Sequence, residues 1–158
     1  MGVLQIRQRW ERLAQPFHFR FAPSPELVPQ SSGAVLIIQV GGWKGERLLG
    51  LLCAAGYDAR VVDERDAALE ILKGEHPILL VVDGAADLNL YRALRAASIV
   101  PILVLAPESD QDLVTTALDA GVDDYQAGPI SNREIIARVH AIVRSARRKS
   151  FGEFVVRA

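Results

Sequence analysis

The sequence is poor in cysteine and histidine and has no long apolar run, and each shortage excludes a class of protein. Its one cysteine, Cys53, cannot form a disulfide within the chain, and its apolar neighbours predict a small core residue. The three histidines are scattered, with no metal-ligand or Ser-His-Asp spacing. No apolar run approaches the length of a membrane span, and arginines interrupt the N-terminal apolar residues, unlike in a secretory signal. We therefore expect a cytoplasmic protein that is not an enzyme and makes no membrane contact.

An excess of charge of one sign is also missing. The 18 Lys and Arg residues nearly balance the 19 Asp and Glu residues, so the formal net charge is −1. A chain this close to neutral has no overall field that would draw it to nucleic acid or to a membrane surface. Half of its 158 residues are apolar, which is enough for one ordinary globular core with extra segments at the ends.

From residue 34 onward, short apolar runs alternate with amphipathic helical patterns. Strands are predicted over 34–40, 59–63, 77–83, 100–106 and 122–127, and helices over 46–56, 64–74, 90–97, 109–121 and 131–148. Strands that are apolar almost throughout and are joined by helices indicate a parallel sheet covered on both faces. The fold class is therefore α/β, a doubly wound five-stranded parallel sheet of five βα units. The more polar fifth strand is expected at an edge.

Several residues at the predicted helix ends have the character of caps. Gly56 follows the first helical pattern and is expected in the left-handed conformation that ends many helices. Asp63 precedes the second helix and is expected to cap it. Ser131 and Glu134 have the spacing of a capping box at the start of the last helix.

Asp83 is the acid that ends the third apolar run. In parallel sheets covered by helices, reactive groups gather at the carboxyl ends of the strands. Its position alone therefore makes Asp83 a candidate site residue.

Five stretches occur in an order and spacing that are typical of one family. "GVDDYQAGPISNREIIARVHAIVRSARR" is similar to the last strand and helix of that family's winged-helix class. "AAGYDARVV", "ALEILKGEHPILLVVD", "YRALRAA" and "VPILVLA" match earlier parts of its fold. On these stretches, residues 34–148 resemble the receiver domain of bacterial response regulators of the OmpR/PhoB type. The resemblance implies a CheY-like, flavodoxin-like fold.

The resemblance also assigns positions to the family's phosphorylation site. A typical receiver holds Mg²⁺ with an acid pair after the first strand and a phosphoacceptor aspartate after the third. A Ser or Thr after the fourth strand and a Lys after the fifth then contact the phosphoryl group. By this resemblance the phosphoacceptor position is Asp83, the acid pair falls at Gln39 and Val40, the hydroxyl at Ala106 and the lysine at Gly128. One of the four functions is retained.

These losses predict a pseudo-receiver. Mg²⁺ is typically held by carboxylates together with the phosphate, so with one carboxylate neither Mg²⁺ nor another cofactor is expected. Phosphoryl transfer depends on positioning and on cations around the transferred group. Asp83 is then expected to be a structural acid that caps the following backbone or bonds Lys44. Tyr125 stands at the family's switch aromatic. With Ala106 in place of a hydroxyl, nothing would draw that ring inward in response to a phosphoryl group, so the domain should stay in one state.

Two other functions stay open. The domain could be a conventional receiver that accepts a phosphoryl group at Asp83, with Lys44 supplying a compensating ammonium. It could also be a small-molecule sensor that uses an uncharged, glycine-rich pocket at "QVGGWKGE", beside a helix N-terminus.

The resemblance further implies a two-fold dimer face on the fourth helix, fifth strand and fifth helix. Its charged residues would be Asp123, Asp124, Glu134, Arg138 and Arg144. Acids on the strand and bases on the helix are self-complementary about a two-fold axis, which favours a homodimer. The alternative is a solvated charged face whose ion pairs contribute little.

The two ends of the chain stand apart from this domain. Residues 1–33 form an N-terminal extension and linker, which would cover apolar surface of its own domain or of a twin, or serve as a partner-docking arm. Residues 149–158 begin as a basic linker, and "FGEFVV" is similar to the first strand before a winged-helix domain. We therefore expect part of a transcription regulator that contacts DNA only through a C-terminal domain absent from this chain. The alternative is a short strand that packs on its own domain.

Overall fold

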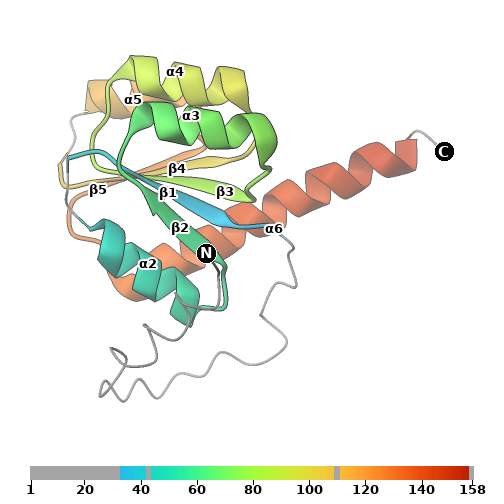
Figure 1. Cartoon of the computed structure of the whole chain (residues 1–158), viewed down its shortest axis with the longest axis horizontal. Helices are drawn as coiled ribbons and strands as arrows, with labels where there is room; N and C mark the ends of the chain where they lie inside the picture. The colour runs from blue at the N-terminus through green and yellow to red at the C-terminus, as the bar shows by residue number, and fades with distance from the viewer. Residues whose placement is uncertain (1–32, 42–43, 109–110, 157–158) are drawn as a thin grey trace.

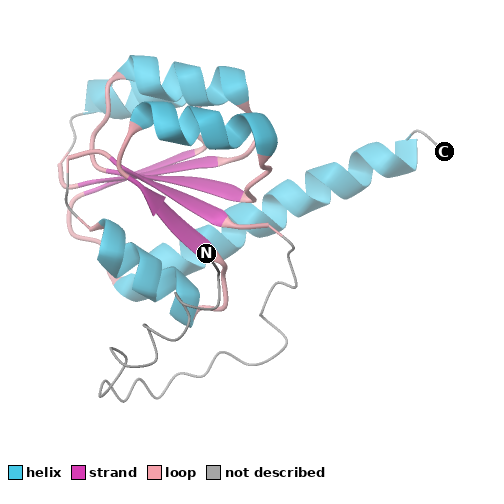
Figure 2. Cartoon of the chain, viewed as in Figure 1, coloured by secondary structure: helices cyan, strands magenta, loops and turns pink. Residues whose placement is uncertain are grey.

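The structure is a computed structural model that describes residues 33–41, 44–108 and 111–156, with the backbone alone for 150–156. The expectations for residues 1–32 lie outside these ranges. The described residues form one sheet flanked by helices (Figures 1 and 2). The strands are β1 (Val35–Gln39), β2 (Ala59–Val62), β3 (Leu79–Asp83), β4 (Ile102–Ala106) and β5 (Asp124–Ala127). The helices are α2 (Gly45–Ala54), α3 (Arg65–Gly74), α4 (Leu88–Ala97), α5 (Gln111–Asp119) and α6 (Asn132–Val156).

All strand pairs are parallel, in the order β2-β1-β3-β4-β5. β1 and β3 pair from Val35 opposite Leu79 to Gln39 opposite Asp83. This confirms the doubly wound α/β fold, and β5 lies at an edge as its polar residues predicted. Because all strands run in one direction, their carboxyl ends meet at one edge of the sheet.

Side-chain alternation along the strands gives each face its own core. Leu36 and Ile38 of β1 point to the face that α3, α4 and α5 cover, and Val35 and Ile37 point to the face that α2 and α6 cover. Figure 1 shows these two helical layers on opposite sides of the sheet. All four side chains are at most 1% exposed, and fully burying such a side chain stabilises the fold by about 1.5–3 kcal/mol.

Two of the three helix caps predicted from the sequence are found in the structure in whole or in part. Gly56 has φ +90° and follows the C-cap of α2, as expected. The Ser131 hydroxyl accepts a hydrogen bond from the Glu134 backbone N–H at 3.1 Å, which is one half of the capping box. Asp63 does not cap α3: the N-cap is Glu64, without a side-chain cap hydrogen bond. The predicted cap position was therefore wrong by one residue. The first turn of α3 has no side-chain cap.

Two further expectations were wrong. Cys53 is exposed, because it follows the buried Leu52 in α2 and one helical step turns it away from the sheet. The expected strand within 149–158 is absent: α6 continues as a helix to Val156 and projects away from the sheet (Figure 1). No proline interrupts this stretch, and Gly152 weakens a helix by only about 1 kcal/mol relative to alanine.

In the part of the chain that is described, no helix has the length and apolarity needed to cross a membrane.

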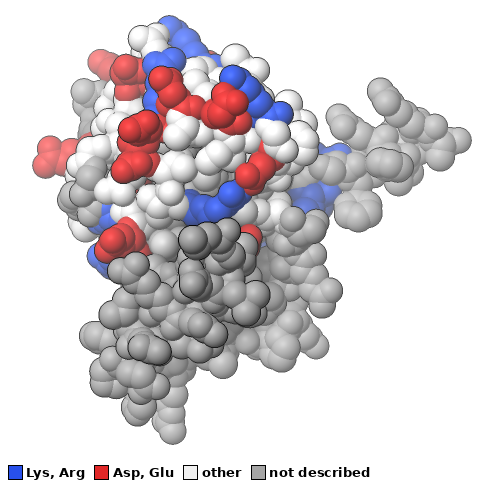
Figure 3. Space-filling model, viewed as in Figure 1, with Lys and Arg blue, Asp and Glu red and all other residues white. Residues whose placement is uncertain are grey.

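The described surface carries both signs of charge. On the face drawn in Figure 3, acidic and basic side chains are interspersed over the side of α3 and α4. This agrees with the near-neutral composition.

Candidate functional site

Asp83 lies at the carboxyl end of β3, between Gln39 of β1 and Leu105 of β4 in the strand registers. Its side chain is fully buried, the only charged side chain among the described residues to be so. A buried carboxylate must be held by hydrogen bonds or charges, since its desolvation is costly. Its contacts therefore indicate what it does.

The contacts of Asp83 hold the loop between β1 and α2. Its Oδ2 accepts a hydrogen bond from the Lys44 backbone N–H at 2.7 Å, and its carbonyl oxygen accepts one from the Val40 N–H at 2.8 Å. Its Oδ1 has no hydrogen-bond partner among the described residues. Burial raises the pKa of the Asp83 carboxyl, and the N–H and positive charge of Lys44 oppose that rise. Asp83 thus bonds Lys44 through the Lys44 main-chain N–H.

A close backbone approach completes this arrangement. Gly84, which follows Asp83, has φ +117°, a conformation that favours glycine. A Cβ at this position would overlap the Val40 carbonyl oxygen. The chain after β3 therefore packs directly against the chain after β1.

The four positions that differ from the family gather at this same edge. Gln39 is opposite Asp83 in the β1–β3 register, and Val40 follows it. Ala106 is 2% exposed at the end of β4, and its carbonyl oxygen accepts the Gly128 N–H at 3.0 Å. The structure therefore brings these positions together, and none of the four carries an ionisable side chain.

The donor set does not fit Mg²⁺. This cation prefers several oxygen ligands with carboxylates among them. Here there is one carboxylate, and one of its oxygens is already bonded to a backbone N–H. Among the described residues, no group of three or more His, Cys, Asp or Glu side chains could hold a metal ion.

Known proteins are similar to this chain in sequence and in fold. MtrA of Mycobacterium tuberculosis, a DNA-binding response regulator, is 32% identical over 114 residues, which are 70% of this chain and 50% of MtrA. The transcriptional regulatory protein BaeR of Escherichia coli is 29% identical over 121 residues, 74% of this chain and 50% of BaeR. A two-component response regulator structure from Clostridium difficile has a TM-score of 0.65 at 22% identity, covering 71% of this chain and 96% of that one.

The chain contains a response-regulator receiver domain. It spans about half the length of the relatives that it matches. No protein-family model matches the sequence.

Tyr125, which the resemblance assigned to the switch aromatic, is buried. Tyr125 in β5 is 7% exposed and packs in the core beneath α3, α4 and α5. Its ring thus lies inward in the structure.

The charged residues expected on a dimer face pair within the chain. Arg138 contacts Asp124 at 3.1 Å and Glu134 at 2.9 Å. Asp123 contacts Arg95 of α4 at 2.7 Å. Arg144 is exposed and makes no ion pair among the described residues. Four of the five residues therefore already have a partner in their own subunit.

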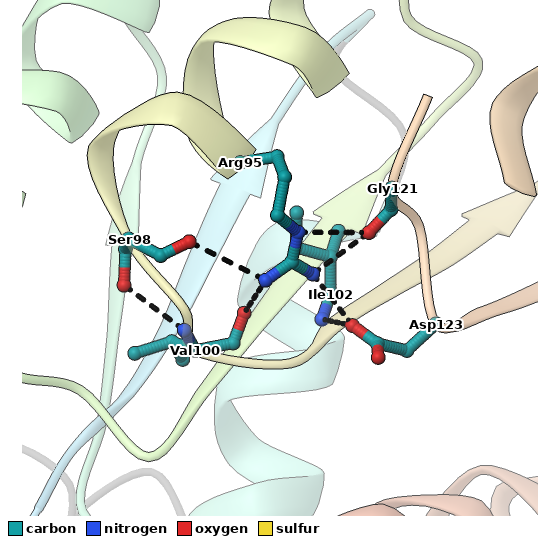
Figure 4. A network of polar contacts seen from close by, with 6 residues as sticks. All are labelled: Arg95, Ser98, Val100, Ile102, Gly121 and Asp123. Carbon is teal, nitrogen blue, oxygen red and sulfur yellow. Dashed lines mark hydrogen bonds and ion pairs between the residues drawn. The ribbon is translucent and has the colours of Figure 1, made fainter. Parts of the chain in front are cut away.

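Arg95 is the centre of a network that sequence analysis missed (Figure 4). Its guanidinium donates to the carbonyl oxygens of Gly121, Ser98 and Val100, with N–O distances from 2.7 to 3.3 Å. The Asp123 carboxylate also accepts from the Ile102 N–H at 2.8 Å. The network thus joins the end of α4 and the start of β4 to the turn between α5 and β5. The sequence signal, an Arg one turn before a helix end, is too common to reveal it.

A cavity of about 290 Å³ lies beside the Asp83 edge, on the face covered by α3 and α4. It is lined by Ile38, Gln39, Val40, Gly41, Asp63, Arg65, Ala86, Asp87 and Leu90. The uncharged pocket expected from the sequence covered residues 39–46, of which Gln39, Val40 and Gly41 line this cavity, and its charged residues were not foreseen. The available signal was that Asp63, Arg65 and Asp87 follow the carboxyl ends of β2 and β3.

Proposed function

We propose that this receiver domain works without phosphorylation, as a regulatory interaction module, and that it is not an enzyme. One observation carries the proposal: the Asp83 carboxylate is buried and bonded to the Lys44 backbone N–H instead of facing a set of metal ligands. A phosphoryl group on the Asp83 Oδ1, the oxygen without a hydrogen-bond partner among the described residues, would find no acid pair, hydroxyl or lysine at the family's positions to stabilise it.

Intact-mass measurement tests this proposal. The chain is incubated with acetyl phosphate and Mg²⁺, beside Asp83→Asn as a blank and a conventional receiver as a positive control. No added phosphoryl mass is expected on the wild-type chain while the control is labelled. Phosphorylation that Asp83→Asn abolishes would support the conventional receiver instead.

We further propose that the domain forms a homodimer through α5, β5 and α6, by apolar contact rather than by exchanged ion pairs. Leu118 of α5 is 43% exposed, an unusual exposure for leucine in this domain. The intrachain pairing of Arg138 and Asp124 leaves little charge free for pairing across an axis.

The oligomeric state is measured by analytical ultracentrifugation across a concentration series. Leu118→Glu should shift the wild-type dimer to monomer. The matched control is Ile99→Glu, because Ile99 is 96% exposed in the loop between α4 and β4, which is not part of α5, β5 or α6. A wild-type monomer, or equal dissociation in both variants, would contradict the proposal.

The names of the relatives support a role in transcription. MtrA is named a DNA-binding response regulator and BaeR a transcriptional regulatory protein, and both are about twice as long as the matched region. We propose that this receiver domain belongs to a cytoplasmic transcription regulator and that DNA is contacted by a further domain. The second candidate function, small-molecule sensing, is favoured by the cavity beside the Asp83 edge.

A further inference from the structure

We infer that the cavity lined by Asp63, Arg65 and Asp87 is a binding site for a small zwitterion of the amino-acid class. The inference deepens the ligand-sensing candidate and rests on it. It does not depend on the proposal that the domain works without phosphorylation, or on the proposed homodimer.

The location of the cavity favours a ligand site. In open α/β sheets, ligands bind outside the carboxyl ends of the strands, where the strand order reverses. Here the order reverses at β1, and the cavity is built from the end of β1 and from the loops that follow β2 and β3. Gln39 and Val40, which stand where the family has its acid pair, line the cavity and Asp83 does not, so the cavity adjoins the Asp83 edge and extends from it toward the loop after β2.

The size and floor of the cavity limit the ligand. Small-molecule pockets typically have volumes of about 300–1,000 Å³, and 290 Å³ is at the lower end of that range. Its apolar lining comes from Ile38, Val40, Ala86 and Leu90. The Gln39 amide oxygen lies against Gly45 of α2, on the other face of the sheet, so Gln39 adds main chain rather than its side chain to the cavity. A small ligand with an apolar part fits this floor.

The positive side of the cavity suits a carboxylate. Arg65 lines the cavity and makes no ion pair among the described residues, so its guanidinium is not neutralised there. Arg65 is also the first residue of α3, whose first turn has no side-chain cap. Uncapped N–H groups and the helix dipole favour an anion at this end. A guanidinium can bind a carboxylate by two parallel hydrogen bonds.

The negative side of the cavity suits an ammonium. Asp63 makes no ion pair within the described ranges. One oxygen of Asp87 accepts the Leu90 N–H at 2.9 Å and fixes that carboxylate at the cavity edge, while its other oxygen makes no hydrogen bond to a described residue. Two carboxylates and one guanidinium over a small apolar floor match a ligand that carries one ammonium, one carboxylate and a short apolar side chain.

Isothermal titration calorimetry of the full chain with each proteinogenic amino acid tests the inference. Amino-acid concentrations up to about 10 mM allow a Kd near 1 mM to be detected. At least one amino acid should bind. For that amino acid, the matching amine without the carboxylate and the matching acid without the ammonium should each bind about tenfold to a hundredfold more weakly. Equal binding of either analogue, or no binding by any amino acid, would overturn the inference.

Two pairs of variants assign the site. Arg65→Met and Asp63→Asn should weaken the binding amino acid by about tenfold or more. The controls are Arg92→Met and Asp66→Asn, which change exposed residues that do not line the cavity and should keep wild-type affinity. All four residues are exposed, so the variants should fold, which circular dichroism verifies.

Unchanged affinity in both site variants would place the ligand elsewhere and refute the site. Loss of amino-acid binding in this test leaves the phosphate-independent proposal standing, because that proposal is measured by phosphoryl mass alone.

Discussion

Arg95→Met removes the guanidinium that joins the end of α4 to the turn before β5. The variant loses hydrogen bonds to three carbonyl oxygens and an ion pair with Asp123, while the aliphatic part of the side chain is kept. A hydrogen bond to a charged group contributes about 1.5–3 kcal/mol. The Arg95 side chain is 30% exposed, so water can replace several of these bonds and the sum must be discounted. We expect a loss of about 2–3 kcal/mol in the free energy of unfolding.

Urea denaturation followed by circular dichroism measures this loss. The matched control is Arg92→Met, an exposed arginine of the same helix with no hydrogen bond or ion pair among the described residues. Its unfolding free energy should stay within about 0.5 kcal/mol of the wild type. The reasoning would be refuted by equal effects of the two variants, because the network would then contribute nothing beyond an ordinary surface arginine.

Two further predictions concern buried polar groups. Burial raises the pKa of the Asp83 carboxyl in the folded protein above its pKa in the unfolded chain, which is about 3.9. Ionisation of Asp83 therefore lowers the free energy of unfolding, beginning near the unfolded pKa and ending above the folded pKa. Relative to Asp83→Asn, the wild type should therefore lose stability as the pH rises from about 4 in urea titrations, and a relative gain would contradict the assignment. Tyr91→Phe removes the hydroxyl that accepts the Ala86 N–H at 3.1 Å, and the buried N–H left behind should cost about 1–3 kcal/mol in the same assay, with no cost as the contrary result.

The fold could be predicted from sequence because its signals are local and repeated. Apolar runs such as residues 77–83 have few options other than a buried parallel strand when helical patterns lie on both sides. The four altered positions around Asp83 could also be placed, because parallel strands bring their carboxyl ends to one edge. Gly128, for example, lies beside Ala106 in space as the family spacing implied.

Contacts between distant loops could not be predicted in this way. Arg95 meets the carbonyl oxygen of Gly121, which is 26 positions away, and no pattern in either segment indicates the contact. The charges of the cavity were missed because Asp63 was interpreted as a helix cap, although Glu64 occupies that position. Capping preferences differ little between neighbouring acids, so the sequence alone does not choose between them.

The charged face illustrates a similar limit. Spacing alone brings Arg138 near Glu134 at one helical turn, but it does not tell whether Asp124 pairs within a subunit or between subunits. In the structure both acids contact the same guanidinium. This is why the proposed dimer test uses Leu118 rather than Arg138, whose substitution would also break contacts inside the subunit.

The most direct test of the account is a two-dimensional NMR titration of the amides near Asp83 with beryllofluoride and Mg²⁺, a mimic of the phosphoryl group. Because one carboxylate without the acid pair, hydroxyl or lysine should not hold this mimic, the amide signals of Lys44, Gly84 and Ala106 should stay where they are in its absence. Saturable shifts of those signals that disappear in Asp83→Asn would contradict the account and identify a receiver that still responds to phosphate.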